Sequence, residues 1–235
     1  MIVKAFPFND EVLDALVASL SPERVATYVT ATSGDRERAL RLYTWNTAAS
    51  AAFYGPLQGL EVALRNAMHR ELVAGYGATW YDNPACGFDA GTLRRIENAK
   101  DDLRRDGYQV DPPHLVAALP FGFWVALLGR GGRAGGLGAP KRNYEMTLWR
   151  PCLHRAFPHV KVSRVQAHQP LDYLRTFRNR IAHHEPIFTR HLAADYQSIL
   201  TVAGWICPKT MDWIDHHSRV EEIIRIPQDS SAIRF

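Results

Sequence analysis

The stretch LDYLRTFRNRIAHHEPIF, at residues 171–188, decides the fold because it joins an amphipathic helix pattern to a proline stop. Its apolar residues recur every three or four positions, which predicts one helix face turned toward a core, at Leu174, Phe177 and Ile181. Pro186 lacks a backbone N–H and its ring clashes with the carbonyl four residues earlier, so the helix must end before it. The sequence therefore predicts a helix whose last turn carries His183 and His184.

Three polar side chains gather near the end of this predicted helix. Asn179 precedes His183 by four residues and shares nearly the same face, while Arg178 lies about 140° around an ideal helix from His183. A guanidinium binds phosphate oxygens through a two-pronged fork, and a histidine can move a proton near neutral pH. The trio therefore suits chemistry at a phosphate. The same residues also fit an ordinary helix C-terminus, where Arg and His side chains satisfy the last carbonyls.

The motif and several segments elsewhere in the chain resemble one bacterial protein family. The run RNRIAHHEPI, at 178–187, closely resembles the signature of the Abi-like (abortive-infection) proteins, members of the HEPN superfamily of nucleic-acid-acting domains. LEVALRNA at 60–67 resembles the family's earlier helix. Two further segments, FGFW at 121–124 and YEMTLWRP at 144–151, resemble the middle part of the family's sequences. The resemblance covers most of the chain. It implies an all-α fold, a HEPN-like helical bundle with additional helices.

The resemblance also implies an activity. Many HEPN proteins are metal-independent ribonucleases with an arginine and a histidine that are four to six residues apart in the sense of intervening positions. Arg178 and His183 fit this spacing, with four residues between them. An endoribonuclease acting in phage defence or as a toxin is therefore expected. His183 would be its acid or base, Arg178 its charge stabiliser, and Asn179 a group that orients His183 or binds phosphate. Because one histidine falls short of an acid–base pair and HEPN domains typically dimerise, we expect a homodimer with one composite site.

Two residues directly after His183 are candidates for supporting or RNA-binding roles. Adjacent positions of a helix point about 100° apart, so His184 is expected to cap the helix, pack against it or touch the next nucleotide. Glu185 either holds one of the two histidines or is a surface residue.

A second set of supporting residues lies on the helix expected at 57–74. Glu61 and Arg65 are four residues apart, so an intrahelical ion pair is the simplest interpretation. The family resemblance implies instead that Glu61, Arg65 and Asn66 form a polar face close to the later motif and contribute to RNA binding. His69, on the same helix, is interpreted as a surface or supporting residue.

The main alternative to catalysis is a non-catalytic helical module. The same cations and imidazoles would then bind RNA or a cognate antitoxin without cutting, and residue identity does not separate the two functions. The chain has 10 histidines, but no His-Glu-x-x-His pattern is present. We therefore expect neither a metal site nor a cofactor.

Composition limits the remaining choices. With 235 residues, 46% of them hydrophobic, the chain is expected to form one domain over residues 1–227 and a flexible tail over 228–235. The formal net charge of +4 is compatible with a nucleic-acid partner without requiring one. The 3 cysteines lack disulfide or zinc spacing, and no apolar run suggests a leader or a membrane span. A cytoplasmic protein without a membrane partner is expected.

Helix patterns fill the rest of the chain, and no strand is predicted. A long helix starting after Asp35 is expected to break or kink at Gly55-Pro56, and a last helix is expected at about 209–224. The glycine-rich basic loop at about 129–142 lacks the Gly-Lys-Ser/Thr ending of a phosphate-binding loop. Its four Arg or Lys residues either follow a phosphate backbone or belong to a solvated insertion.

Overall fold

The computed structural model describes residues 6–235, which are built from helices without a β-strand. This confirms the all-α prediction. The chain divides into two compact units, unit 1 (Met1–Pro56, Arg178–Tyr196 and His217–Phe235) and unit 2 (Leu57–Phe177 and Gln197–His216). The single domain expected over 1–227 stays a prediction. Across the described part of the chain, every helix is too short or too polar to span a bilayer.

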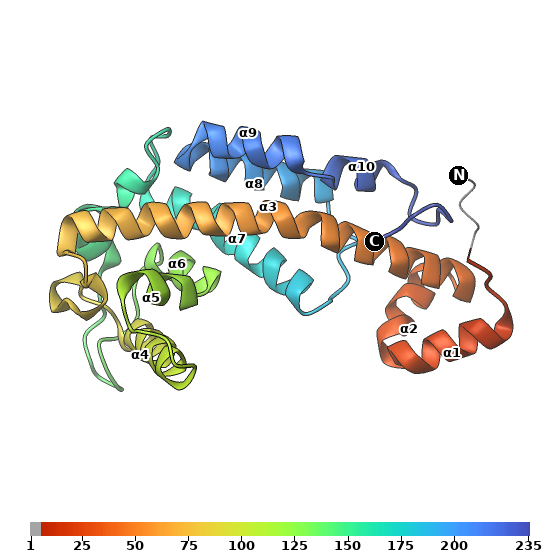
Figure 1. The fold of residues 1–235 in the computed structure, drawn as a ribbon, viewed down its shortest axis with the longest axis horizontal. Helices are drawn as coiled ribbons and strands as arrows, with labels where there is room; N and C mark the ends of the chain where they lie inside the picture. The colour runs from red at the N-terminus through yellow and green to blue at the C-terminus, as the bar shows by residue number, and fades with distance from the viewer. Residues whose placement is uncertain (1–5) are drawn as a thin grey trace. The chain divides into compact units, whose positions relative to one another are not determined.

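Unit 1 begins with two short helices that pack against the start of a long one. These are α1 (Asp10–Leu20), α2 (Pro22–Ala31) and the first part of α3 (Arg36–Tyr76). The Asn9 side chain caps α1 by accepting the Val12 N–H at 2.9 Å. One residue from each helix enters a shared buried cluster of Leu13, Val25 and Leu40. Figure 1 shows α1 and α2 side by side, which is how both apolar faces are covered.

A second apolar cluster in unit 1 receives the chain that follows α7. Tyr28, Ala39 and Leu42 are buried together, and Phe188 packs on them with its ring centroid 5.2 Å from that of Tyr28. Helix α10 (Val220–Arg225) also belongs to this unit. The carbonyl of Ile226, just after α10, accepts the Trp45 indole N–H at 2.8 Å. Of the C-terminal residues, Ile233 is buried, at 4% exposure.

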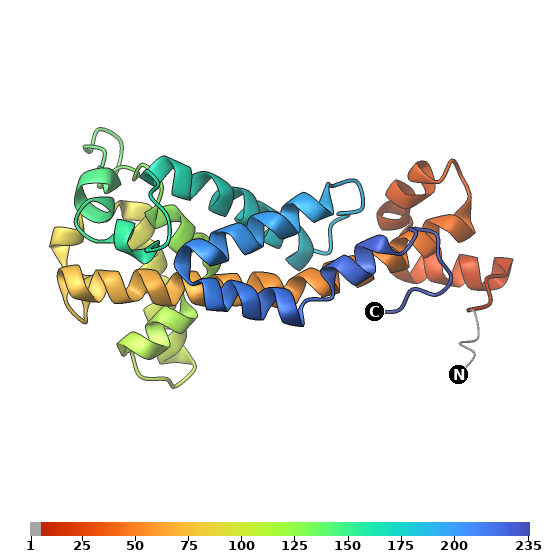
Figure 2. The same ribbon diagram turned by 90° about the horizontal axis from the view of Figure 1, so that it is seen from above.

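Unit 2 is organised around an aromatic core. Trp80 and Trp124 are both fully buried, with ring centroids 5.8 Å apart. The Trp124 indole N–H is satisfied by the Leu119 carbonyl at 3.2 Å. Around this core lie α4 (Ala90–Arg105), α5 (Pro112–Ala118) and α6 (Phe121–Leu127). Helix α4 packs against both α5 and α6, and Figure 2 shows α4 and α5 together on one side of α3.

Short helices and three longer ones complete unit 2. The short ones are η1 (Trp80–Asp82), η2 (Pro84–Cys86), the π-helix η3 (Glu145–Trp149) and η4 (Leu153–Ala156). The longer ones, which extend into both units, are α7 (Arg164–Ala182), α8 (Leu192–Ile206) and α9 (Pro208–His217). Helix α9 approaches α3 closely at Gly59, where a Cβ would lie 2.9 Å from Cγ1 of Ile214. A glycine is needed there because a side chain would collide with that isoleucine.

The glycine-rich segment 129–142, named here the basic hairpin, folds back on itself and is attached to α4. Arg133 and Lys141 form an isolated antiparallel β-bridge, and the Arg142 N–H donates to the Gly132 carbonyl at 2.8 Å. The Asp89 carboxylate accepts the Gly132 N–H at 2.6 Å with one oxygen. Its other oxygen caps α4. The base of the hairpin therefore has a defined conformation next to the start of α4.

Two predicted helix boundaries are wrong. Of the two outcomes predicted at Gly55-Pro56, the break is wrong and the kink stays a prediction, since α3 continues through Pro56 although the missing N–H costs about 3 kcal/mol in a helix interior. Burial of Phe53, Leu57 and Leu60, each at most 4% exposed, offsets that cost. The boundary between the two units nevertheless falls at Pro56. The predicted last helix is also two helices, α9 and α10, separated at residues 218–219.

Candidate functional site

The candidate site is the end of α7, whose last turn belongs to unit 1. Two backbone bonds close the helix, from His184 N–H to the Ile181 carbonyl at 3.0 Å and from Glu185 N–H to the Arg180 carbonyl at 2.8 Å. His184 has φ +56°, the left-handed conformation. This is the Schellman arrangement, in which the residue after the cap is usually glycine. Histidine occupies the glycine position here.

This geometry corrects the predicted position of both histidines. Helix α7 ends at Ala182, so His183 and His184 follow the helix and do not lie in its last turn. The left-handed His184 turns the chain away from the helix axis two residues before Pro186, so the helix ends earlier than the proline requires. The predicted apolar face is confirmed, because Leu174, Phe177 and Ile181 are all buried.

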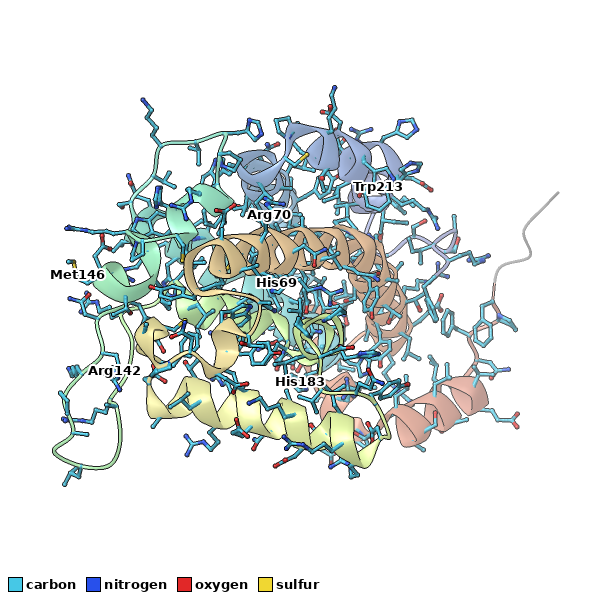
Figure 3. All side chains as sticks on the ribbon, turned by 60° about the vertical axis from the view of Figure 1, so that its left-hand side comes forward. His69, Arg70, Arg142, Met146, His183 and Trp213 are labelled. Atoms are coloured by element: carbon cyan, nitrogen blue, oxygen red, sulfur yellow. The ribbon has the colours of Figure 1, made fainter. Side chains whose placement is uncertain are left out.

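The three predicted catalytic residues lie within one turn of this helix end. Arg178 and Asn179 are half-buried on α7, and His183 is exposed directly after it. The backbone N–H of His183 donates to the Asn179 carbonyl at 2.9 Å, which keeps the two residues one turn apart. The end of α7 therefore carries an exposed imidazole that follows a half-buried arginine and a half-buried amide by four to five residues. Figure 3 labels His183 among the side chains.

Glu185 pairs with an arginine of the same turn. Its carboxylate lies 3.2 Å from Nε of Arg180. Within residues 6–235, that Nε has no hydrogen-bond partner, so the contact is an ion pair without an aligned N–H. Both side chains are more than 40% exposed, which limits such a pair to at most about 1 kcal/mol. Of the alternatives predicted for Glu185, the surface residue is the one that this pairing favours.

Three contacts from other helices of unit 1 hold the segment that follows the motif. Arg24 of α2 donates from Nη1 to the His184 carbonyl at 2.8 Å. Asn46 of α3, only 5% exposed, accepts the N–H groups of Ile187 at 2.7 Å and of Phe188 at 3.1 Å through Oδ1. Side chains distant in sequence thus fix the backbone on the far side of His183 and His184.

Sequence reasoning missed Arg24 and Asn46. For Asn46 a signal was present, because it lies four residues after Leu42 and three before Ala49, and this helical spacing puts it on the same face as two apolar residues. A polar residue on a buried stripe needs a hydrogen-bond partner, which marks it as a structural anchor. For Arg24 the sequence offers no comparable signal, since exposed helical arginines are common.

The predicted polar face on α3 belongs to unit 2. One carboxylate oxygen of Glu61 accepts the Phe121 N–H at 3.0 Å, which satisfies a free donor at the start of α6. Arg65 is half-buried, and its Nε is a buried donor without a hydrogen-bond partner among the described residues. Asn66 is exposed. The expected proximity of these three residues to Arg178 and His183 stays a prediction.

His69 has the supporting role that was one of its two predicted alternatives. Its Nδ1 accepts the indole N–H of the fully buried Trp80 at 3.0 Å. Burial lowers the pKa of His69, which favours the neutral imidazole that this hydrogen bond requires. Within residues 6–235, the structure brings no three His, Cys, Asp or Glu side chains together as metal ligands.

Comparison of the chain with protein-family models, with curated proteins and with solved structures finds no match.

Proposed function

We propose that this protein is a metal-independent endoribonuclease of the HEPN type, an Abi-like protein that acts in abortive phage defence or as a toxin. The observation that carries the proposal is the end of α7, where half-buried Arg178 and Asn179 lie one turn from the exposed His183. The all-α fold is compatible with the HEPN-like bundle that the sequence resemblance implies. RNA cleavage without a metal needs an imidazole that moves a proton and a guanidinium that stabilises the developing charge, and both residue types occur at this helix end.

The proposed reaction begins at the ribose 2′-hydroxyl. His183 takes its proton, and the 2′-oxygen attacks the adjacent phosphorus to form a new O–P bond. The bond from phosphorus to the 5′-oxygen breaks, and a protonated imidazole gives that oxygen its proton. The products are a 2′,3′-cyclic phosphate and a free 5′-hydroxyl. Arg178 stabilises the charge that develops on the phosphorane, and Asn179 orients His183 or binds phosphate.

This chemistry needs an acid as well as a base, and each chain supplies one His183. We therefore propose a homodimer in which the two copies of the motif face one composite site. In this scheme the second imidazole is His183 of the other copy, and His184 keeps a supporting role. We assign the protein to the cytoplasm, where its free thiols stay reduced, and propose an antitoxin or a triggering signal that keeps it silent before infection.

The deciding experiment incubates the purified protein with total bacterial RNA in excess EDTA and analyses the product ends. We expect discrete cuts with 2′,3′-cyclic phosphate ends. His183→Ala should lower the rate by about 10²–10⁴-fold, and Arg178→Ala by about 10²–10³-fold. His159→Ala, at an exposed histidine of unit 2, is the matched control and should cleave as the wild type does. Circular dichroism and sedimentation confirm that each variant keeps its fold and assembly.

Three results would contradict the proposal. Undiminished cleavage by His183→Ala would remove the acid–base role. Products with 3′-hydroxyl ends would show a different bond being cut. RNA that binds but is never cut, with equal toxicity of wild type and both site variants in cells, would assign the protein to the alternative class, a module that binds RNA or an antitoxin.

A further inference from the structure

The basic hairpin concentrates positive charge without acidic neighbours in the sequence. It carries Arg130, Arg133, Lys141 and Arg142, and no Asp or Glu occurs between Asp111 and Glu145. Four positive charges in this segment equal the formal net charge of +4 of the whole chain. All four residues are exposed. The hairpin is therefore a segment of purely positive charge in unit 2.

These four side chains also lack ionic partners in the structure. None of them forms an ion pair in the described part of the chain, as is also true of Arg94 and Arg95 on α4, whereas Arg104 and Arg105 of the same helix do. Arg104 lies 2.6 Å from Asp101, and Arg105 lies 2.8 Å from Asp102. The nearest acid in the hydrogen-bond network of the hairpin, Asp89, uses its oxygens on backbone N–H groups. The charge on the hairpin thus stays available to a ligand.

The cross-strand pairing places two like charges together. Arg133 and Lys141 are opposite each other in the β-bridge, and bridge partners have Cβ atoms about 5 Å apart on one face. Like charges in this relation are destabilising unless an anion lies between or beside them. Arg133 uses one donor, Nη1, on the Ala139 carbonyl at 3.1 Å, which braces the guanidinium across the hairpin. Its other N–H groups stay available for an anion.

The hairpin presents these cations from a fixed base. Gly131, with φ +83°, leaves no room for a side chain, because a Cβ would lie 3.0 Å from the Arg142 carbonyl. The Ala90 N–H donates to the Arg133 carbonyl at 3.0 Å, so the hairpin is attached to the start of α4. Figure 3 shows the hairpin extending from Arg142 beside that end of α4. A ligand is therefore met by a partly ordered row of cations instead of freely moving side chains.

We propose that the basic hairpin binds the sugar–phosphate backbone of single-stranded RNA, independently of base sequence. Arg and Lys side chains on a narrow projecting element neutralise phosphates and release counterions. A membrane surface fits less well, because the tip offers a single apolar side chain, Leu137, and burying one leucine contributes only about 1.5–3 kcal/mol. The choice of RNA rests on the proposed function, since attack by a 2′-hydroxyl requires a strand that can leave the helical geometry.

The test measures binding of a fluorescent, uncleavable 2′-O-methyl oligouridine of about 20 nucleotides by anisotropy, between 50 and 200 mM salt. Each phosphate contact contributes about 0.7 to the slope of log affinity against log salt. Alanine at all four hairpin cations should therefore flatten the slope by up to about 3 and weaken binding at least about tenfold at 50 mM salt. A matched variant with alanine at Arg104, Arg105, Lys161 and Lys209 changes the net charge equally and should bind almost as the wild type does.

The outcomes separate this proposal from the nuclease proposal. Equal affinity and salt slope of the two quadruple variants would overturn the hairpin proposal, whether or not the protein cleaves RNA. If the protein binds the oligouridine through the hairpin but never cleaves RNA, the hairpin proposal stands and the nuclease proposal is wrong. Wild-type binding to phosphatidylserine vesicles without any binding to the oligouridine would also overturn it and assign the hairpin to a membrane surface.

Discussion

The Asn46 side chain is held against the backbone of Ile187, with 2.7 Å between its Oδ1 and the Ile187 nitrogen. Asn46 is only 5% exposed and Ile187 is fully buried, so neither group has water as an alternative partner. The same oxygen also accepts the Phe188 N–H. One amide of α3 thus fixes the chain four residues after His183, and it connects the stability of unit 1 to the position of the motif.

Asn46→Leu should lower the free energy of unfolding by about 2–3 kcal/mol. It leaves two buried N–H groups without an acceptor, and each such loss costs about 1–3 kcal/mol before relaxation of the backbone. Urea unfolding monitored by circular dichroism measures the change. Asn66→Leu, at an exposed position of the same helix, is the control and should shift the free energy by less than about 0.5 kcal/mol. Equal stability of the two variants would show that the buried acceptor is not required.

His184→Gly should stabilise the protein by about 1 kcal/mol. A residue with a Cβ in the left-handed conformation costs about 1–2 kcal/mol, part of which glycine returns as greater freedom of the unfolded chain. The hydrogen bond from Arg24 persists, since it ends on the His184 carbonyl. Differential scanning calorimetry should show a melting temperature about 2–4 °C higher for a chain of this size.

His184→Ala separates the backbone effect from the loss of the imidazole. It keeps the strained Cβ and should not raise the melting temperature. If His184→Gly melts below the wild type, the imidazole makes a stabilising contact that outweighs the strain. If the His184→Gly variant keeps full activity in the cleavage assay, the role of His184 is to cap the helix. If the variant loses activity, the imidazole of His184 contacts the RNA.

The elements that sequence reasoning predicted well are those fixed by local chemistry. The apolar face of α7 at Leu174, Phe177 and Ile181, and the end of that helix before Pro186, depend on residues within one or two turns. The features it missed depend on partners far away in the chain. The left-handed His184 is followed by a segment anchored through Asn46, 141 residues from Ile187, and α3 continues through Pro56 because its apolar residues are buried.

The basic hairpin illustrates the same limit. Its glycines and cations are plain in the sequence, and no strand was predicted because glycine-rich segments lack the alternating pattern of strands. The bridge between Arg133 and Lys141 forms across a turn whose base is held by Asp89, 43 residues before Gly132. Only tertiary structure supplies that acceptor.

The hydrogen bond between His69 and Trp80 should make folding stability depend on pH. Burial lowers the pKa of His69 in the folded protein below its usual value near 6.5. As the pH falls below about 6.5, the unfolded chain binds a proton that the folded chain does not, so the free energy of unfolding decreases. The contribution is complete above that pH.

Urea midpoints at pH 7.5 and pH 5.5 measure this dependence, with His69→Gln as the comparison. Glutamine offers an oxygen acceptor to the Trp80 indole but does not titrate, so the difference between the two midpoints should shrink. His168, whose pKa burial also lowers, contributes equally to both proteins and cancels. An unchanged difference in the variant would mean that His69 binds its proton as easily in the folded as in the unfolded chain.

Asp89 should control the order of the basic hairpin separately from the stability of α4. One of its oxygens accepts the Thr92 N–H at 2.7 Å as the cap of α4, and the other accepts the Gly132 N–H at 2.6 Å. Burial alone would raise the pKa of Asp89, but these hydrogen bonds outweigh it and lower the pKa, so the carboxylate stays charged in the folded protein. Asp89→Ala removes both interactions and should cost about 2 kcal/mol.

Asp89→Asn distinguishes the two roles. The amide oxygen still caps α4, but the amide nitrogen cannot accept the Gly132 N–H. We expect a loss of less than about 1 kcal/mol in urea unfolding, together with faster hydrogen exchange of the Gly132 amide, measured by NMR. Exchange as slow as in the wild type would show that the hairpin is held by its other contacts. In that case Asp89→Asn should leave oligouridine binding unchanged. If the Gly132 amide instead exchanges faster, the loosened hairpin should bind the oligouridine more weakly, although all four of its cations are still present.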